Sequence, residues 1–469
     1  MTKRSSCDYD AVVIGTGPGG NAASERIAQR GGTVCQIDKG AIGGTCVNVG
    51  CMPTKAMLAA SQRFYQAGRD DGMGFSVTPP HLDGRAFMDR VHRMVDTLNH
   101  SMREKLESID EIDLVEGFAR VVDAHSVEID SDGQKQTVSA RSLLIATGSS
   151  PVVPDFLDVE SNRIWLSDDA LAAETVPDSV IILGGGPLGC EFATVWSELG
   201  KDVTIIEMSD RLLGTMDTEA SLAARRLLED RGVRFHMETS IRSGKVKDDR
   251  VELADDSRTF SAEHVLCAIG RRANMKGCGL ENLGIDTERP YIHVDARCWT
   301  GIEQVYAVGD VADSRNYAHL AARMGTVAGD NIMGFEAADD RSVVPTAVYT
   351  HPEIACVGLC GEACENDAGE ELVELSESYS HSGSAYVRGR QEGMIKLLVA
   401  PRSGRICGAL WIGPHSVDML HELVLAMRAE LTIEQIRQTI HGHPSFQEML
   451  HTLAEQFEQE YLLDSAAES

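Results

Sequence analysis

The chain has few basic residues for its size. Lys and Arg total 43 against 72 Asp and Glu in 469 residues, so the formal charge is −29. Nucleic acids and anionic membrane surfaces are bound mainly through basic side chains. We therefore expect neither a nucleic-acid partner nor a membrane partner.

Long apolar runs and low-complexity tracts are also missing. No run approaches the roughly 18 apolar residues of a membrane span. The first apolar run, Ala11 to Ile14, is short and is followed directly by glycines, unlike the core of a signal peptide. We expect a cytoplasmic protein in which most of the twelve cysteines are reduced.

Two segments of the chain repeat a strand, a glycine turn, a helix and a second strand that ends in an acidic residue. They run from Asp10 to Asp38 and from Val180 to Glu207. In a dinucleotide-binding βαβ unit, the glycines let the backbone approach a pyrophosphate at the helix N-terminus, and the acid accepts a ribose hydroxyl. One GxGxxG match alone also fits a tight turn without a ligand. Because the whole unit occurs twice, we predict two dinucleotide sites, on Gly15, Gly17, Gly20 and Asp38 and on Gly184, Gly186, Gly189 and Glu207.

The acid of the second site also indicates which nicotinamide cofactor it takes. A carboxylate at Glu207 repels a 2′-phosphate, and the four residues after it include a single arginine, Arg211. The pattern favours NAD over NADP.

Further apolar segments indicate how the chain is divided. Leu143 to Gly148 and Val265 to Gly270 each end a strand on glycine, and Val305 to Asp310 is a strand that ends on aspartate. From about Pro345 the pattern changes to alternating and then helical periodicity. We predict an α/β protein with Rossmann-like domains at 1–150 and 151–275, a central segment at 276–344 that completes the first domain, and a C-terminal α+β domain at 345–469.

Cys46 and Cys51 lie in the segment Gly43 to Lys55. In a regular helix, two residues five apart are not on one face and are too distant for an unstrained disulfide. Gly50 and Pro53 allow the segment to leave regular geometry, which would bring the sulfurs together at a helix start. A helix N-terminus lowers a thiol pKa from about 8.5. The alternative is a pair of reduced, buried cysteines.

His443 and Glu448 form a second candidate site. Pro444 is predicted in the first turn of a helix, where proline is favoured, so that Glu448 lies near the helix start. A carboxylate that holds a histidine in one tautomer makes a general base. The alternative is a capping or surface histidine, which is how we interpret the neighbouring His441.

The order of these motifs resembles the class I pyridine nucleotide-disulfide oxidoreductases, from Tyr9 to about Phe457. Within that family, Glu207 and the segment Tyr349 to Glu353 are most similar to the dihydrolipoamide dehydrogenases. The resemblance implies FAD and NAD as cofactors, no metal, and a homodimer built on the C-terminal domain.

The resemblance also implies site residues. It places Lys55 and Glu191 in an ion pair beside the flavin and the nicotinamide. The implied FAD contacts are Gly15, Gly17, Gly20, Asp38, Lys55, Ala119, Thr147, Gly148, Asp310, Asn316, Tyr317, Ala318 and His319. The implied NAD contacts are Gly184, Gly186, Gly189, Glu207 and Gly270.

The mechanism implied by the resemblance oxidises dihydrolipoamide at a Cys46–Cys51 disulfide, and His443 of the other subunit takes the proton. The substrate would be carried by a lipoyl protein of a 2-oxo acid dehydrogenase or glycine cleavage complex, or be a small disulfide. Val47 and the segment from Ser445 to Gln447 depart from the lipoamide enzymes. Two alternatives therefore stay open: a glutathione-reductase-like enzyme, and a non-enzymatic flavin redox sensor or assembly subunit. The acidic side chains of Glu422, Glu430 and Glu434 either receive a basic partner or form a solvated face.

Overall fold

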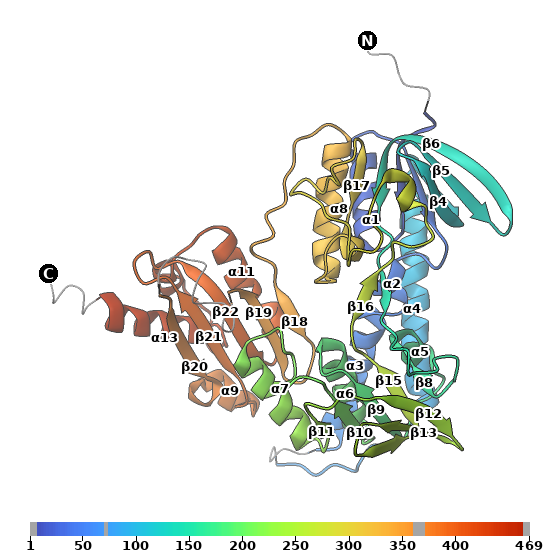
Figure 1. The fold of residues 1–469 in the computed structure, drawn as a ribbon. Coiled ribbons are helices and arrows are strands. Elements are labelled where there is room, and N and C mark those ends of the chain that lie inside the picture. Colours follow the sequence, from blue (N-terminus) through green and yellow to red (C-terminus); the bar gives the residue numbers. More distant parts are fainter. Residues whose placement is uncertain (1–6, 70–73, 360–370, 463–469) are drawn as a thin grey trace.

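The computed structural model describes residues 7–69, 74–359 and 371–462. Its strands form separate sheets, and helices pack against the larger ones (Figure 1). We call the three parts built on the main sheets the first, second and third units, in chain order.

The first unit is built on a sheet in the order β3-β2-β1-β6-β5-β4, with β17 paired to β6. β17 comes from far along the chain and is parallel to β6, so the segment after the second unit returns to the first sheet. The strands are β1 (Tyr9–Ile14), β2 (Val34–Asp38), β3 (Ile112–Glu116), β4 (Phe118–Asp123), β5 (Ser126–Ser131), β6 (Gln134–Ile145) and β17 (Val305–Ala307).

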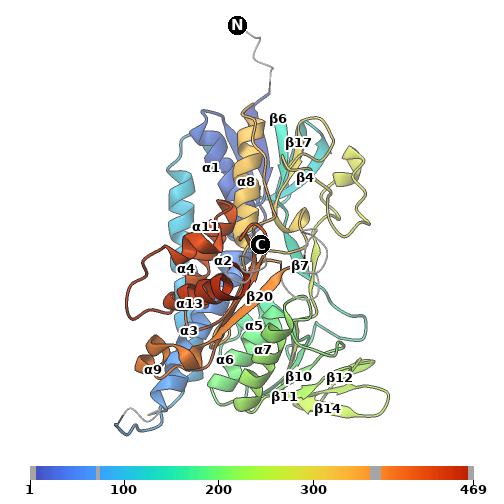
Figure 2. The same cartoon turned by 90° about the vertical axis from the view of Figure 1, so that its left-hand side faces the viewer.

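Helices α1 (Pro18–Gln29) and α8 (Ala318–Ile332) lie side by side against this sheet (Figures 1 and 2). Glycines allow their close approach, because a Cβ on Gly325 would lie 2.1 Å from the carbonyl oxygen of Gly19. The contact anchors the start of α1 between the strands and α8.

The second unit repeats the parallel arrangement in the order β11-β10-β9-β15-β8. An antiparallel sheet, β12-β13-β14, lies beside this parallel sheet. The short pair β7 and β16 joins the second unit to the first. The elements are β7 (Ser149–Pro151), β8 (Ile164–Trp165), α5 (Ser167–Ala172), β9 (Ser179–Leu183), α6 (Pro187–Glu198), β10 (Asp202–Ile206), α7 (Thr218–Asp230), β11 (Arg234–His236), β12 (Ser243–Lys247), β13 (Arg250–Ala254), β14 (Thr259–Ala262), β15 (His264–Cys267) and β16 (Arg271–Ala273).

Three helices connect the first and second units. They are α2 (Gly44–Asn48), α3 (Cys51–Ala67) and α4 (Gly84–Glu107). α3 packs against α6 and α4, and α4 runs from the first sheet toward the second in Figure 1. The segment with the two cysteines therefore lies where the two units meet.

The third unit is an antiparallel sheet in the order β18-β19-β22-β21-β20. Its elements are β18 (Thr346–Val348), β19 (Glu353–Gly358), β20 (Val373–Ser378), α9 (Gly383–Arg388), β21 (Met394–Val399), β22 (Ile406–Gly413), α10 (Ser416–Met419), α11 (His421–Arg428), α12 (Ile433–Arg437) and α13 (Glu448–Phe457). Lys396 of β21 is buried and donates to Asp217 at 2.8 Å and to Glu219 at 2.7 Å, which joins the third unit to the second.

The prediction that Pro444 lies in the first turn of a helix was wrong. Helix α13 begins at Glu448, and residues 443–447 form a bend before it. Phe446 explains the difference, because its buried ring stacks on Tyr379 with the ring centroids 4.6 Å apart. Packing of this side chain keeps the segment outside the helix.

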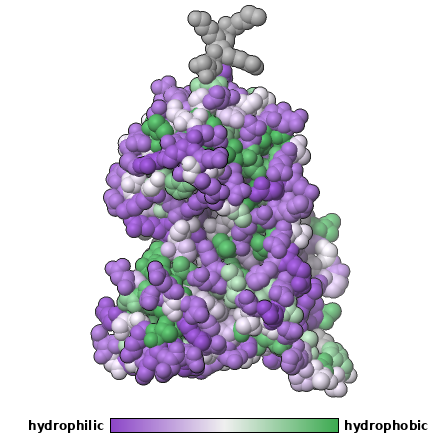
Figure 3. Space-filling view, turned by 90° about the vertical axis from the view of Figure 1, so that its right-hand side faces the viewer, coloured by the Kyte–Doolittle hydropathy of each residue, from purple (hydrophilic) through white to green (hydrophobic). Residues whose placement is uncertain are grey.

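The surface agrees with the acidic composition. On the face drawn in Figure 3, hydrophilic residues predominate and hydrophobic ones form separate groups. Within the described ranges, no helix is both long enough and apolar enough to cross a membrane.

Candidate redox site

The two cysteines of the motif lie on either side of a break between α2 and α3. α2 ends at Asn48, and Cys51 is the first residue of α3. Gly50 permits the tight turn, since a Cβ there would lie 2.8 Å from the carbonyl oxygen of Thr45. The break brings the thiols of Cys46 and Cys51 into a hydrogen bond with each other.

This contact shifts the pKa values of the two thiols in opposite directions. The hydrogen bond from Cys46, together with the ammonium of Lys55, lowers the pKa of Cys51 to about 7, although burial opposes the shift. The same hydrogen bond and burial raise the pKa of Cys46 well above its ordinary value. The pair therefore holds its negative charge on Cys51 while Cys46 stays protonated.

Lys55 lies one helical turn after Cys51 and is held by a buried carboxylate. Its Nζ donates to Glu191 Oε2 at 2.7 Å, and the Glu191 residue is 4% exposed. The other oxygen of Glu191 accepts the backbone N–H of Tyr349 at 3.1 Å. The ring of Tyr349 also lies 4.5 Å from Nζ of Lys55. The structure thus brings together Lys55 and Glu191 and adds Tyr349, whose contact no local sequence pattern indicates.

The glycines of the first βαβ unit have distinct spatial roles. A Cβ on Gly15 would lie 2.3 Å from the carbonyl oxygen of Ala146, and one on Gly20 would lie 2.1 Å from that of Gly15. These two glycines allow strand, turn and helix to pack closely. A Cβ on Gly17 would meet nothing within 4 Å, at the N-cap of α1. Gly17 therefore leaves room for a phosphate at the positive end of the helix.

The second βαβ unit repeats this arrangement. A Cβ on Gly184 would lie 2.5 Å from the carbonyl oxygen of Ala268, and one on Gly189 would lie 2.0 Å from that of Gly184. A Cβ on Gly186, the N-cap of α6, would meet nothing within 4 Å. The residues present thus fit two dinucleotides, each with its pyrophosphate at a helix N-terminus.

The two acidic residues lie at the edges of the two glycine turns, which we call the first and second cradles. Asp38 accepts the N–H and the hydroxyl of Thr16 at 2.7 and 2.6 Å. Glu207 accepts the N–H of Gly185 at 2.6 Å and that of Ser209 at 2.8 Å. Each carboxylate is therefore oriented by its own glycine turn.

The arginine that follows Glu207 is occupied elsewhere. Arg211 donates to the hydroxyl of Thr218 at 3.0 Å and to the carbonyl oxygen of Gly214 at 3.1 Å. The arrangement favours NAD, because a 2′-phosphate would meet the carboxylate of Glu207 while the guanidinium is turned toward α7.

Several of the other predicted cofactor residues gather where β6 and β17 end. Asp310, three residues after the end of β17, accepts the hydroxyl of Ser149 at 2.6 Å. Thr147 donates to the carbonyl oxygen of Asn274 at 2.7 Å, and the carbonyl oxygen of Gly148 accepts the N–H of Asn274. Parallel pairing of β6 with β17 is what brings these segments together.

The remaining predicted residues lie in more varied places. Ala119 is buried in β4, and Gly270 follows β15 with open space at its Cα. Asn316 and Tyr317 precede α8, which begins at Ala318, and Tyr317 bonds with Thr346 at 2.9 Å.

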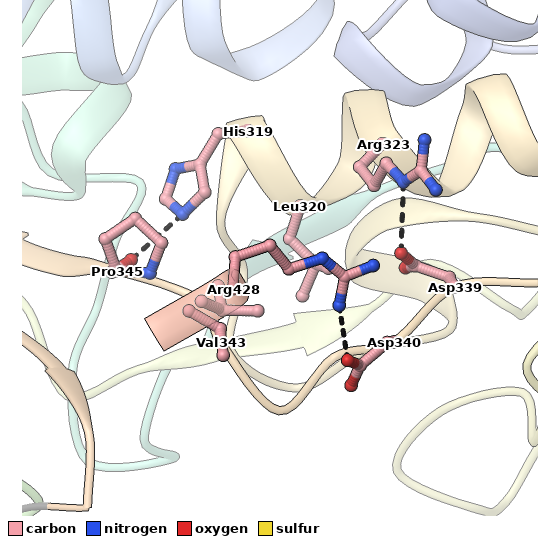
Figure 4. A pocket seen from close by; sticks show the side chains of 9 residues that line it. His319, Leu320, Arg323, Asp339, Asp340, Val343, Pro345 and Arg428 are labelled. Atoms are coloured by element: carbon pink, nitrogen blue, oxygen red, sulfur yellow. Dashed lines mark hydrogen bonds and ion pairs between the residues drawn. The ribbon is translucent and has the colours of Figure 1, made fainter. Parts of the chain in front are cut away.

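His319 lines a cavity of about 400 Å³ (Figure 4). Its Nε2 is 3.0 Å from the carbonyl oxygen of Pro345, and the ion pairs of Arg323 with Asp339 and of Arg428 with Asp340 line the same cavity. None of the other predicted site residues lines it.

His443 and Glu448 form a carboxylate–imidazole pair at the start of α13. Nδ1 of His443 is 2.9 Å from Oε1 of Glu448, whose Oε2 accepts the N–H of Ser445 at 2.8 Å. The Ser445 N–H and then His443 hold the pKa of Glu448 below its ordinary value. A carboxylate only accepts, so the proton is assigned to Nδ1, and Nε2 is left as a base.

The chain does not bring this histidine pair to its own cysteines. Figure 1 draws α13 on the side of the third unit that faces away from α2 and α3. The side chain of His443 is 82% exposed. The pair is thus presented outward on the third unit.

The acidic side chains considered as a partner surface are paired within the chain. Each is bonded to a basic side chain at 2.7–2.9 Å: Glu422 to His441, Glu430 to Arg405 and Glu434 to Arg437. His441 is 8% exposed and fastens the bend before α13 to α11.

Two dinucleotide cradles that meet at a dithiol, together with an ion pair beside that dithiol, define a flavoprotein disulfide oxidoreductase. Residues 9–325 match the family described as pyridine nucleotide-disulphide oxidoreductase, and residues 344–454 match its dimerisation domain. The chain belongs to this family. It is therefore an oxidoreductase with FAD and NAD as cofactors, and the predicted fold class and family are confirmed.

Individual relatives cover almost the whole chain. It is 34% identical over 457 residues to dihydrolipoyl dehydrogenase of Haloferax volcanii, covering 95% of each chain. It is also 34% identical over 454 residues to that of Geobacillus stearothermophilus, covering 96% of each.

Two solved structures have a similar fold over almost the whole chain. LpdA from Mycobacterium tuberculosis has a TM-score of 0.88 at 25% identity, covering 95% of this chain and 99% of that one. The HOCl-induced flavoprotein disulfide reductase RclA from Escherichia coli has a TM-score of 0.85 at 26% identity, with the same coverage.

Proposed function

We propose that this chain is a dihydrolipoyl dehydrogenase, which oxidises protein-bound dihydrolipoamide to lipoamide with NAD⁺. The observation that carries the proposal is the hydrogen-bonded pair of Cys46 and Cys51, with the charge held on Cys51. The names of the relatives, which match along almost the whole chain, support the choice of substrate.

The two cysteines have different roles in the proposed reaction. A substrate thiolate attacks Sγ of Cys46 in the oxidised enzyme, the Cys46–Cys51 bond breaks, and Cys51 leaves as a thiolate. The second substrate thiol then attacks the substrate sulfur bound to Cys46, which forms lipoamide and releases Cys46 as a thiol. Thiols of low pKa leave faster, which agrees with a pKa of about 7 for Cys51.

Other residues of the chain hold charge and protons. Nε2 of His443 takes the proton of the attacking thiol, while Glu448 keeps the imidazole in that tautomer. Lys55, held by Glu191, stabilises the Cys51 thiolate.

Two sets of residues hold the cofactors in this proposal. When bound, FAD accepts the two electrons of the dithiol and NAD⁺ carries them away as hydride. The FAD residues are Gly15, Gly17, Gly20, Asp38, Lys55, Ala119, Thr147, Gly148, Asp310 and Asn316 to His319. The NAD residues are Gly184, Gly186, Gly189, Glu207 and Gly270.

We also propose a homodimer in which His443 of one chain serves the cysteine pair of the other. Two observations support it: the match to the dimerisation domain, and the position of α13 away from α2 and α3. Three further points stay predictions. They are the domain boundaries at 150/151, 275/276 and 344/345, a cytoplasmic location, and a partner that is a lipoyl protein of a 2-oxo acid dehydrogenase or glycine cleavage complex.

Steady-state kinetics test the function directly. The holoenzyme should oxidise dihydrolipoamide with NAD⁺ much faster than with NADP⁺, and Cys46→Ser should abolish turnover while FAD stays bound. Faster reduction of glutathione disulfide by NADPH would instead make it a glutathione-reductase-like enzyme. A yellow protein that is reduced by NADH but turns over neither substrate would favour the sensor.

A further inference from the structure

Helix α6 carries a second buried carboxylate that the proposed reaction does not use. Glu198 is 3% exposed and comes seven residues after Glu191. Seven residues make about two helical turns, or roughly 10 Å, so both carboxylates leave the same face of α6. That face packs against α3, the helix that begins with Cys51.

The two carboxylates make parallel sets of contacts. Glu191 joins Lys55 of α3 to the N–H of Tyr349. Glu198 accepts the hydroxyl of Ser61, also on α3, at 2.7 Å and is bonded to Nδ1 of His351 at 2.9 Å. Both carboxylates therefore connect α3 to the loop between β18 and β19 of the third unit.

Arg231, at the C-cap of α7, supplies a compensating positive charge. Its guanidinium lies 3.5 Å from Glu198 and donates to the carbonyl oxygen of His351 at 2.5 Å. It also lies 5.1 Å from the ring centroid of Tyr65 on α3. A buried carboxylate is stable only when it is paired in this way, so the contacts of Glu198 depend on a definite arrangement of α3, α6, α7 and the loop.

The position of α3 along α6 matters for the cysteine pair. A slip of one residue moves a helix by about 1.5 Å along its axis, enough to break a hydrogen bond of ordinary length. Lys55 and Cys51 lie on the same helix, so such a slip would break the contact of Lys55 with Glu191 on α6, the contact that fixes the Lys55 ammonium beside the Cys51 thiolate. Among the charged or titratable groups around the pair, Lys55 lowers the pKa of Cys51 by more than Glu191 raises it. Asp310 acts on Cys46, and Tyr349 also faces Cys51.

We propose that Glu198, Ser61 and His351 form a positioning cluster that holds α3 in register on α6, so that Glu191 keeps the ammonium of Lys55 beside the thiolate of Cys51. The inference rests on the proposed role of the cysteine pair. It predicts that a change far along α6 alters the acidity of a thiol that it does not touch.

The test measures the acidity of Cys51 without substrate. Cys46→Ser in the FAD-bound protein leaves Cys51 as the reporter, and a serine hydroxyl can still donate to its sulfur. The rate of alkylation of the Cys51 peptide by iodoacetamide, resolved by mass spectrometry, is followed against pH. Glu198→Gln in this background should raise the apparent pKa of Cys51 by about 1 unit, the lower end of what a neighbouring opposite charge contributes.

Variants of His351 provide a second route if Glu198→Gln does not fold. His351→Ala should produce the same shift, whereas His351→Asn, whose side-chain N–H can replace Nδ1–H, should keep the value of the parent. The matched control is Asp217→Asn, which removes a carboxylate that is 2% exposed and also bridges two units through Lys396, while Asn still caps α7. It should lower the melting temperature without moving the pKa of Cys51.

Two outcomes overturn the inference: an unchanged pKa of Cys51 in Glu198→Gln or His351→Ala, or an equal shift in Asp217→Asn. The second outcome would mean that any loss of stability disturbs the thiol. Because turnover of dihydrolipoamide is measured separately, a wild-type protein without that activity would refute the proposed function and leave this result standing.

Discussion

Two alanine substitutions in one glycine turn should have opposite consequences, because the structure gives the two glycines different surroundings. Gly17→Ala should leave the apoprotein about as stable as before and weaken FAD binding. Gly20→Ala, three residues later, should destabilise the apoprotein itself. The contrast tests whether the first cradle was correctly assigned to a pyrophosphate.

The magnitudes follow from backbone geometry and space. Gly17 has φ −66° and ψ 176°, which alanine adopts without strain, and its Cβ would meet nothing within 4 Å. Replacing Gly17 by alanine restricts the unfolded chain, which stabilises the folded protein by about 0.4–1 kcal/mol. Alanine is a poorer N-cap than glycine by a similar amount, so the net change in the free energy of unfolding is small. A Cβ on Gly20 would lie 2.1 Å from the carbonyl oxygen of Gly15, so the backbone must shift. This shift should lower the free energy of unfolding by about 1–3 kcal/mol or more.

A methyl group at Gly17 should act only on the cofactor. Overpacking of about 1–3 kcal/mol against a bound phosphate corresponds to roughly 5- to 150-fold weaker FAD binding. Flavin absorbance during titration of the apoprotein measures this affinity, and thermal unfolding of the apoprotein measures stability. Gly186→Ala is the matched control: it should raise KM for NAD⁺ and leave FAD binding unchanged. Wild-type FAD affinity in Gly17→Ala, or an undisturbed apoprotein in Gly20→Ala, would refute the reasoning.

Three further results are expected. Glu448→Gln should lower kcat for dihydrolipoamide by about 100-fold and alter its pH profile, because His443 loses the group that fixes its tautomer, while FAD content stays unchanged; an unaltered kcat would contradict this role. The pKa of Cys51 is lowered from 9 to about 7 in the folded dithiol, so its stabilising contribution is present above pH 9 and is lost as pH falls through 7. Denaturant unfolding of the dithiol enzyme should therefore show stability rising from pH 7 to 9, and Cys51→Ser should lack this rise. Glu207→Ala should raise kcat/KM for NADP⁺ relative to NAD⁺ by at least about tenfold, because it removes a carboxylate that repels the 2′-phosphate. An unchanged ratio would mean that this carboxylate does not face the 2′ position.

The parts of the site that sequence patterns predicted are local ones. The glycine turns follow from spacing over a few residues, since Gly15 and Gly20 are required wherever a strand enters a helix this closely. The break between Cys46 and Cys51 likewise depends on Gly50, which lies inside the motif. Pro444 shows the limit, because packing of a buried side chain over a distant tyrosine overrode the local preference of proline for a helix start.

By itself, the sequence determined that the chain has two dinucleotide cradles, a cysteine pair at a helix start and a histidine with a carboxylate nearby. Only the tertiary structure decided which charges share the buried space around that pair. Tyr349 reaches Glu191 across 158 positions of the chain, and His351 reaches Glu198 across 153. The groups that lower the pKa of Cys51, Cys46 and Lys55, lie within five residues of it. Its burial and the carboxylate of Glu191 come from segments that are brought together only when the units pack.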